Sequence, residues 1–159
     1  MQEVILPPGL WRISNAAFGW CEELTRITVP ATTGEIGEES FACCYKLPKD
    51  FVQNLPFGLE TIDDHAFNVC VSLEGFTIPP TVDFLGISAF ADSGLIEVNL
   101  ATKETALQVI PRQAFCSCER LQSVALSNSL KRIGEGAFEQ CASLISVVIP
   151  PDSSFIVEG

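Results

Sequence analysis

The chain has 159 residues, of which 47% are hydrophobic, and a formal net charge of −11 from 20 acidic and 9 basic residues. This apolar content is sufficient for a folded core, whereas the negative charge disfavours nucleic acid and anionic membrane surfaces as partners. No apolar run approaches the roughly 18 residues of a membrane helix, so direct membrane insertion is not expected either.

A repeated pattern organises the sequence, and its clearest copy is IGEGAFEQCASLISVVIP at residues 133–150. Counted from a Phe, the residue five before it is Ile or Leu, and the third residue after it is usually Cys. Leu follows at the sixth position, apolar residues follow at the ninth and eleventh, and Pro follows at the twelfth. The Phe spacings of 23, 26, 23, 25 and 23 residues fall in the range of leucine-rich repeats.

Taken in order, the chain is predicted to be one repeat domain over residues 1–159. A partial repeat occupies residues 1–7, and six repeats follow near 13–30, 36–56, 62–79, 85–101, 110–127 and 133–150. A further partial repeat occupies 151–159, where Ile156 is predicted to take the start position. The pattern predicts that the sequence begins and ends within a repeat, and uncapped ends are expected to contact neighbouring protein.

Two repeats depart from the pattern. In the second, Asp50 falls where an inward apolar residue is due and Pro56 comes three residues late, which predicts an insertion at Phe51–Leu55. The fourth is one residue short at Gly94, where glycine permits a tighter turn, and is then three residues long around Thr102–Gln108. Loops inserted into a solenoid are candidate binding segments.

The spacings inside a repeat predict two local structures. Alternating apolar positions before the Pro indicate a short strand with one buried face, and Pro ends the strand because it has no N–H to donate. The segment from Ile to Cys has helix-like spacing but is too short for a stable helix, so a single turn or 3₁₀ segment is predicted. One repeat cannot bury its own apolar side chains, whereas stacked repeats with parallel strands can.

These units resemble the leucine-rich repeat of the BspA-like family, also called the Treponema pallidum type, over about Val4 to Ile156. The resemblance implies a curved right-handed leucine-rich repeat solenoid with a parallel β-sheet on the concave face and short turns or 3₁₀ segments on the convex face. It also implies adhesion or protein recognition, often on a cell surface. The seven cysteines instead fit a reducing interior, so the compartment stays open.

The cysteines follow the repeat. Five of them occupy the third position after a Phe, where the fourth repeat has Ser93, and they are predicted to form a stacked interior row: Cys21, Cys44, Cys70, Cys118 and Cys141. Disulfides or a metal site are the alternatives, but the C-x₂-C spacing typical of zinc sites is absent. Cys43 and Cys116 lie outside the row and are predicted to be the exposed or reactive thiols.

No enzyme or cofactor motif stands out. His65 follows Asp63 and Asp64, an arrangement that could serve a general base, but sister repeats place Glu38 and Glu39 in the same turn, which favours a solvated surface. The recurrent turn acids are predicted to keep the surface soluble, or alternatively to select a basic partner: Glu35, Glu38, Glu39, Asp63, Asp64 and Asp83. No metal, cofactor or catalytic residue is predicted.

The predicted function is non-catalytic protein binding through the concave sheet face or the inserted loops. The outward side chains of that face come at the eighth and tenth positions after each Phe and are mostly small and uncharged. The candidate binding residues are Arg26, Thr28, Asn54, Thr77, Glu97, Asn99, Ser123 and Ser146. The alternatives are a structural subunit that assembles through its uncapped ends, and a segment of a cell-surface adhesin. The partner protein is not identified by the sequence.

Overall fold

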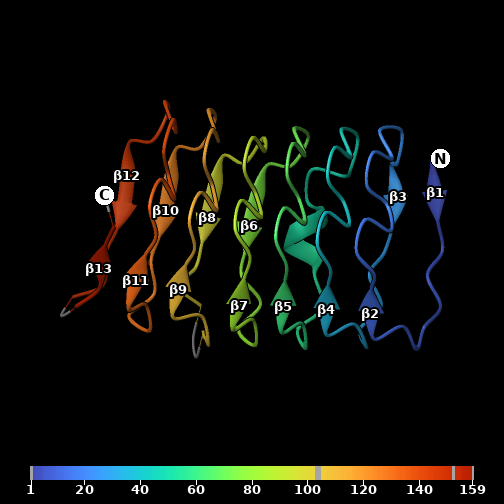
Figure 1. Cartoon of the computed structure of the whole chain (residues 1–159), viewed down its shortest axis with the longest axis horizontal. Helices are drawn as coiled ribbons and strands as arrows, with labels where there is room; N and C mark the ends of the chain where they lie inside the picture. Colours follow the sequence, from blue (N-terminus) through green and yellow to red (C-terminus); the bar gives the residue numbers. More distant parts are fainter. Residues whose placement is uncertain (1, 103–104, 152, 159) are drawn as a thin grey trace.

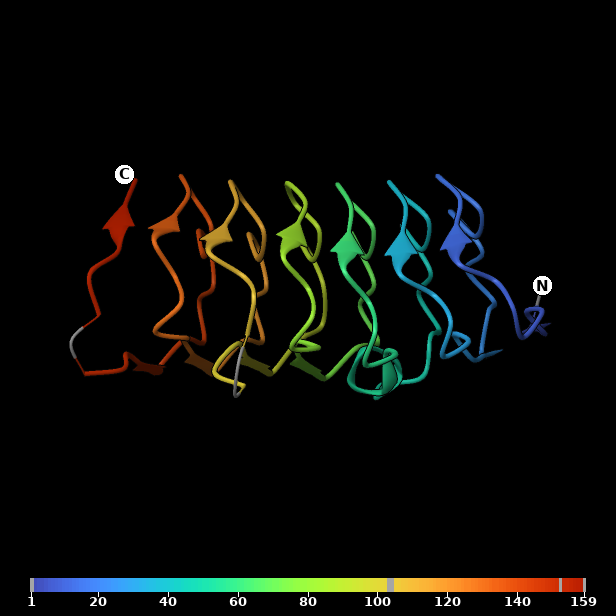
Figure 2. The ribbon, with the colours of Figure 1, turned by 90° about the horizontal axis from the view of Figure 1, so that it is seen from below.

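The chain winds into a single row of stacked coils, as the computed structural model shows for residues 2–102, 105–151 and 153–158 (Figures 1 and 2). Coils 1 to 6 are named here after their repeat phenylalanines, which are Phe18, Phe41, Phe67, Phe90, Phe115 and Phe138. Each coil crosses two rows of short parallel strands on opposite sides of the stack, and the turns between the rows enclose the core.

The first row, called the sheet face, carries the strands that the sequence predicts. Its strands are β1 (Glu3–Val4), β3 (Arg26–Ile27), β6 (Gly75–Thr77), β8 (Glu97–Asn99), β10 (Ser123–Ala125) and β12 (Ser146–Val148). Strands β6, β8, β10 and β12 form one continuous ladder, whereas β1 and β3 form a separate pair. Between them, coil 2 replaces its strand with a 3₁₀ helix, η1 (Phe51–Asn54).

The alternation along these strands follows the predicted pattern. In coil 5, Val124 and Leu126 are buried, while Ser123 and Ala125 between them are partly exposed. The register keeps equivalent positions adjacent, because Val98 pairs with Phe76 on one side and with Val124 on the other. Every inward side chain therefore packs on the inward side chains of the neighbouring coils, and the predicted solenoid with parallel strands is confirmed.

The second row, called the opposite row, consists of two-residue strands that the sequence analysis did not predict. They are β2 (Arg12–Ile13), β4 (Glu35–Ile36), β5 (Thr61–Ile62), β7 (Phe84–Leu85), β9 (Val109–Ile110), β11 (Arg132–Ile133) and β13 (Ile156–Val157). The Ile or Leu assigned to a turn is thus the inward residue of a strand. Helix-like spacing misled the prediction because each strand is held by bonds to adjacent coils and not by bonds within its own segment.

The last strand also corrects the predicted start of the partial repeat at 151–159. In β13 it is Val157 that pairs with Ile133, while Ile156 pairs with Arg132. The connection from coil 6 is therefore one residue longer than the pattern predicts.

A third set of inter-coil bonds runs through the turns around each Phe. In coil 3, the main-chain N–H groups of His65, Phe67 and Val69 donate to carbonyls of coil 4 at 2.9, 2.8 and 2.9 Å. The flanking residues, two before and two after each Phe, have positive φ in every coil: Ala16, Trp20, Glu39, Cys43, His65, Val69, Ser88, Asp92, Gln113, Ser117, Gly136 and Gln140. Non-glycine residues seldom adopt this conformation, and the bonds to the next coil hold it in place.

The phenylalanines form the centre of the core. Their rings stack face to face from coil to coil, with successive centroid distances of 5.4, 5.4, 5.1, 5.6 and 5.4 Å. Stacked rings at this distance contribute beyond their buried area. The four inner rings are fully buried, whereas Phe18 and Phe138 in the end coils are partly exposed.

The predicted insertion in coil 2 is what forms η1. Phe51 takes the inward place that Asp50 leaves unfilled, and its ring lies 5.3 Å from that of Phe41 and 6.1 Å from that of Phe67. Val52 and Leu55 are also buried. The insertion is therefore part of the core and not a free loop, which leaves only Gln53 and Asn54 of this segment exposed for binding.

Coil 4 accommodates its deletion and its insertion separately. A side chain at Gly94 would lie 2.0 Å from the Val71 carbonyl oxygen, so close packing against coil 3, and not a positive φ, requires glycine. The segment 102–108 buries Thr105 and Leu107, and residues 103–104 lie outside the described structure. At this coil the ladder of the opposite row is interrupted between β7 and β9.

In the described residues, no helix has the length and apolarity to traverse a lipid bilayer.

Candidate functional site

The structure brings the eight predicted binding residues onto one surface, the sheet face. Six lie on strands, and a seventh, Thr28, comes just after β3: Arg26 is on β3, Thr77 on β6, Glu97 and Asn99 on β8, Ser123 on β10 and Ser146 on β12. The eighth, Asn54, is the last residue of η1. Ser123 is partly exposed and the others are exposed. Their shared surface follows from the two-residue period of a strand.

Two parts of this face are hollowed. Over β6 to β12 lies a shallow groove of about 230 Å³, whose lining includes Thr77, Glu97, Asn99 and Ser123. At the other end, a hollow of about 640 Å³ lies against β1 and β3, with Arg26 and Thr28 in its lining. The groove coincides with the predicted residues, whereas the larger hollow also contains apolar residues and prolines that the prediction did not include.

A third cavity, which we call the slot, lies between β3 and η1. It measures about 300 Å³ and is lined by Ile27, Thr28, Val29, Pro48, Asp50, Phe51 and Asn54. The sequence analysis named Thr28 and Asn54 but did not place them together, because they belong to different coils and Asn54 sits in an irregular segment. The signal for the slot was Pro48, which cannot donate a main-chain hydrogen bond where coil 2 would pair with β3.

Ion pairs neutralise much of the charge near this face. Arg26 Nη2 lies 3.5 Å from Glu3 Oε2, and Lys49 Nζ lies 3.3 Å from Glu74 Oε2. All four side chains are substantially exposed, so each pair contributes little to stability. In the described residues, Asp50 and Glu97 have no Lys, Arg or His within 4.0 Å. They are the face's uncompensated carboxylates.

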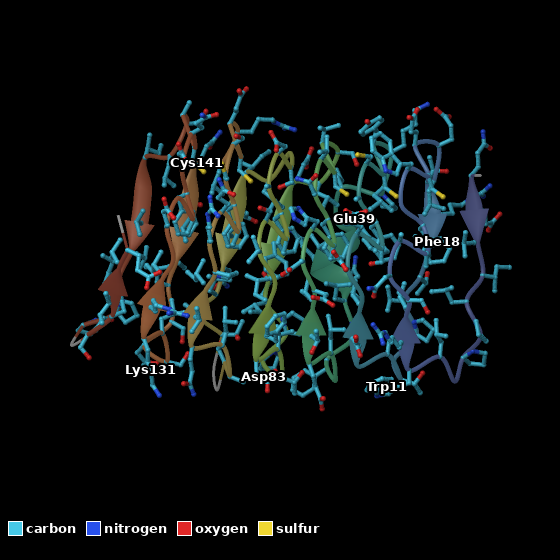
Figure 3. The ribbon with its side chains drawn as sticks, viewed as in Figure 1. Trp11, Phe18, Glu39, Asp83, Lys131 and Cys141 are labelled. Carbon is cyan, nitrogen blue, oxygen red and sulfur yellow. The ribbon has the colours of Figure 1, made fainter. Side chains whose placement is uncertain are left out.

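The predicted cysteine row is confirmed, and it adds bonds between coils. Four thiols of the row donate from Sγ to the carbonyl oxygen of the preceding coil's Phe: Cys44 to Phe18 at 3.1 Å, Cys70 to Phe41 at 3.0 Å, Cys118 to Phe90 at 3.2 Å and Cys141 to Phe115 at 3.2 Å. In Figure 3 the sulfur atoms lie along the turns on the side where Cys141 is labelled. All seven cysteines are free thiols.

Burial makes these thiols poor nucleophiles. Desolvation raises the pKa of Cys44 and of Cys118 to about 12 and that of Cys141 to about 11, and it also raises the pKa of the fully buried Cys70. A thiol with a raised pKa stays protonated at neutral pH and reacts slowly. The row is therefore structural.

One of the two thiols outside the row was mispredicted. Cys43 is buried, with 6% of its surface exposed, although Trp20 at the equivalent place in coil 1 is 68% exposed. Cys116 is partly exposed, and its Sγ lies 3.6 Å from Ser117 Oγ. Of the predicted pair, only Cys116 keeps surface access.

The acidic side chains in the turn around His65 have a structural role. Asp63 Oδ1 accepts a bond from the Asp64 N–H at 2.8 Å, and Asp64 Oδ1 accepts one from the Ile87 N–H of the next coil at 2.6 Å. Both carboxylates are thus committed to main-chain donors, and His65 holds a positive φ beside them. Among the described residues, no three His, Cys, Asp or Glu side chains cluster in a way that could hold a metal ion.

Comparison with known proteins matches the chain to one family model. The model described as the BspA type leucine rich repeat region matches residues 1–101 and 51–158, in six copies. No curated protein matches the sequence.

Solved structures share the fold over nearly the whole chain. The T. pallidum leucine-rich repeat protein is 31% identical with a TM-score of 0.83, and the match covers 96% of this chain and 72% of that one. A leucine-rich repeat protein from Bacteroides ovatus is 27% identical with a TM-score of 0.84, over 98% of this chain but only 39% of that one. The pneumococcal vaccine antigen PcpA, at 16% identity and a TM-score of 0.66, shows the fold alone, over 94% of this chain and 42% of that one.

Proposed function

The chain belongs to the BspA-type leucine-rich repeat family, and we propose that it is a non-catalytic module that binds a protein partner through the sheet face. Members of such repeat families present extended surfaces built from equivalent positions of successive coils. In this chain the three-residue strands of the sheet face present two outward side chains each, whereas the two-residue strands of the opposite row present one.

The observation that carries this proposal is the groove over β6 to β12. Four strands of three residues each place small, mostly uncharged side chains in two parallel rows, so the surface of a protein partner can approach the strands closely. The groove has a volume of about 230 Å³, which is below the roughly 300–1,000 Å³ of small-molecule sites and suits contact with a protein surface better.

Affinity capture tests the proposal. The chain is immobilised and exposed to a lysate and a surface fraction of its source organism at physiological salt, and retained proteins are quantified by mass spectrometry. We expect one stoichiometric partner, lost on Thr77→Arg because the long cation projects into the groove from its β6 end. The matched control is Thr61→Arg on β5 of the opposite row, which is expected to retain the partner. Equal retention by both variants would contradict binding through the sheet face.

The exposed edge of coil 6 supports a second candidate, assembly of a larger structure through the ends of the solenoid. Val147 and Ile149 are 47% and 56% exposed there, although the equivalent residues of coil 5, Val124 and Leu126, are 1% and 2% exposed. Uncovered apolar side chains and an unpaired strand edge favour contact with further protein. Light scattering over a concentration series tests this candidate, and a monomer at every concentration would count against assembly of this chain with itself.

A further inference from the structure

We propose that the slot is a strand-addition site, in which an extended cationic segment of a protein partner lies between β3 and η1 and bonds to the open edge of β3. This inference rests on the proposed function and specifies how part of the sheet face engages its partner. Such binding uses main-chain hydrogen bonds for affinity and side-chain pockets for selectivity.

The first support is a main-chain donor that has lost its acceptor. At the eleventh position after Phe, or the tenth in the shortened coil 4, the N–H donates to the next coil: Ile78 to Asn99 at 3.0 Å, Leu100 to Ala125 at 2.8 Å and Leu126 to Val148 at 2.9 Å. Val29 holds this position in coil 1. Its N–H has no hydrogen-bond acceptor in the described part of the chain, because coil 2 offers η1 where the next strand would be.

The second support is a matching acceptor. In the regular coils the carbonyl oxygen before the strand accepts an N–H from the next coil, as Glu74 does from Ile96 at 2.6 Å and Ile96 does from Gln122 at 2.8 Å. Thr25 holds the corresponding position in coil 1. No described residue donates to its carbonyl, since the residue that faces it across the gap is Pro48. Edge donor and edge acceptor therefore point to the same side of β3.

The slot itself is the third support. Ile27, Val29 and Phe51 give it an apolar wall, and they are 8%, 7% and 5% exposed. A main-chain N–H at so buried a residue is destabilising without a partner. The slot shares Ile27, Thr28 and Pro48 with the larger hollow against β1 and β3. Together the two cavities form a continuous space that can hold more than a single side chain.

Charge selects the partner's chemistry. Asp50 lies in the slot lining and has no cationic side chain within 4.0 Å among the described residues, and its Oδ2 accepts only a 3.2 Å bond from Asn54 Nδ2. The nearest basic residues of the face, Arg26 and Lys49, are already paired with Glu3 and Glu74. A Lys or Arg on the incoming segment would meet an uncompensated carboxylate, in a chain whose net charge is −11.

Amide hydrogen exchange tests the open edge without any ligand. We expect the Val29 amide to exchange much faster than the amides of Ile78 and Leu126, which are bonded to neighbouring strands. Equal protection of all three amides in the free chain would overturn the proposal, because it would mean that β3 is already paired.

Peptide binding tests the occupant. Random peptides displayed on phage are selected against the whole chain, and the selected peptides are synthesised and titrated into isotope-labelled protein. We expect basic peptides that shift the amide resonances of Ile27, Thr28 and η1 and slow the exchange of Val29. Methylation of a peptide N–H that faces β3 should weaken binding about tenfold, the effect of losing one hydrogen bond.

Two variants and a control locate the site. Thr28→Trp should block the slot and abolish the shifts, Asp50→Asn should weaken basic peptides, and Thr61→Trp on β5 of the opposite row should leave peptide binding unchanged. Peptides that shift only the resonances of β6 to β12 would overturn the slot and leave the proposed function standing. If no peptide binds, the slot is refuted as a strand-addition site, and partner capture decides the proposed function separately.

Discussion

Coils 2 and 3 fill the same place in the core with different backbones. In coil 3, β6 points Phe76 inward, where its ring lies 4.5 Å from that of Phe90. In coil 2, η1 points Phe51 inward, with its ring 5.3 Å from that of Phe41. The core requires an apolar side chain at this height, which Ile27, Val98 and Val124 supply in other coils, whereas the strand ladder can be given up. The replacement of the coil 2 strand by η1 leaves the edge of β3 open.

The largest expected effect tests whether η1 replaces the strand in the core. Phe51→Ala and Phe76→Ala should each lower the free energy of unfolding by about 3–5 kcal/mol, the cost of removing a buried aromatic ring. Urea denaturation measures both. A loss below about 1 kcal/mol for Phe51→Ala alone would mean that η1 lies on the surface of the core and does not complete it.

The second effect compares the two strand edges. Ile78→Pro removes the N–H that bonds to Asn99 and should lower the free energy of unfolding by about 1–3 kcal/mol, since an acceptor is left unpaired. Val29→Pro removes an N–H without an acceptor in the described structure and should cost clearly less. Thermal unfolding of the two variants side by side gives the comparison. A greater loss for Val29→Pro would show that β3 has a partner within the chain.

The third effect concerns the cysteine row, which runs through coils 2 and 3 and continues into coil 5. The folded pKa values of Cys44 in coil 2 and Cys118 in coil 5 are about 12, above the value of 9.0 for a free thiol. Their stabilising contribution is therefore complete below pH 9 and is lost as the pH rises from 9 towards 12. For the buried Cys118 the slope is about 1.4 kcal/mol per pH unit. Urea denaturation at pH 8 and pH 10 measures it.

The control for this prediction comes from the chain itself, because coil 4 has Ser93 at the same position. Cys118→Ser should fold and should show a weaker loss of stability between pH 8 and pH 10. An unchanged pH dependence in this variant would show that Cys118 ionises as easily in the folded chain as in the unfolded one.

The smallest effects concern exposed ion pairs that link neighbouring coils. Lys49 and Glu74 link coils 2 and 3 at 3.3 Å, and Arg112 and Glu135 link coils 5 and 6 at 3.7 Å. Lys49→Ala and Arg112→Ala should each change the free energy of unfolding by about 1 kcal/mol or less, and the change should diminish in high salt. A large, salt-independent loss for Lys49→Ala would mean that the side chain packs against η1.

Much of the site could be read from spacing. The inward and outward positions of the sheet face follow from a two-residue period, so the sequence alone predicts that Thr77, Asn99 and Ser123 share one surface. Their role in binding stays a prediction, since geometry shows where side chains lie and not what they contact. The irregular coil was also visible, because Asp50 breaks the apolar pattern and Pro56 comes late.

The spacing of residue types could not predict which strands of neighbouring coils pair. The opposite row was missed because Ile13 and its equivalents are held in strands by neighbours 23 to 26 residues away, and a local pattern carries no record of such bonds. Cys43 was expected at the surface for the same reason. Its burial does not follow from the position alone, because Trp20 in coil 1 has the same positive φ and the same kind of inter-coil bond and is 68% exposed.

The sequence by itself determined the number of repeats, the stacked phenylalanines and the cysteine row, because each depends on a residue type recurring at a fixed interval. Only the tertiary structure decided that Phe51 would enter the core through a 3₁₀ helix, and that Val29 and Thr25 would be left facing a cavity. The physical reason is that main-chain hydrogen bonds between coils depend on which backbone groups come to lie opposite one another. An insertion of three residues changes that arrangement without leaving any mark in the composition of β3 itself.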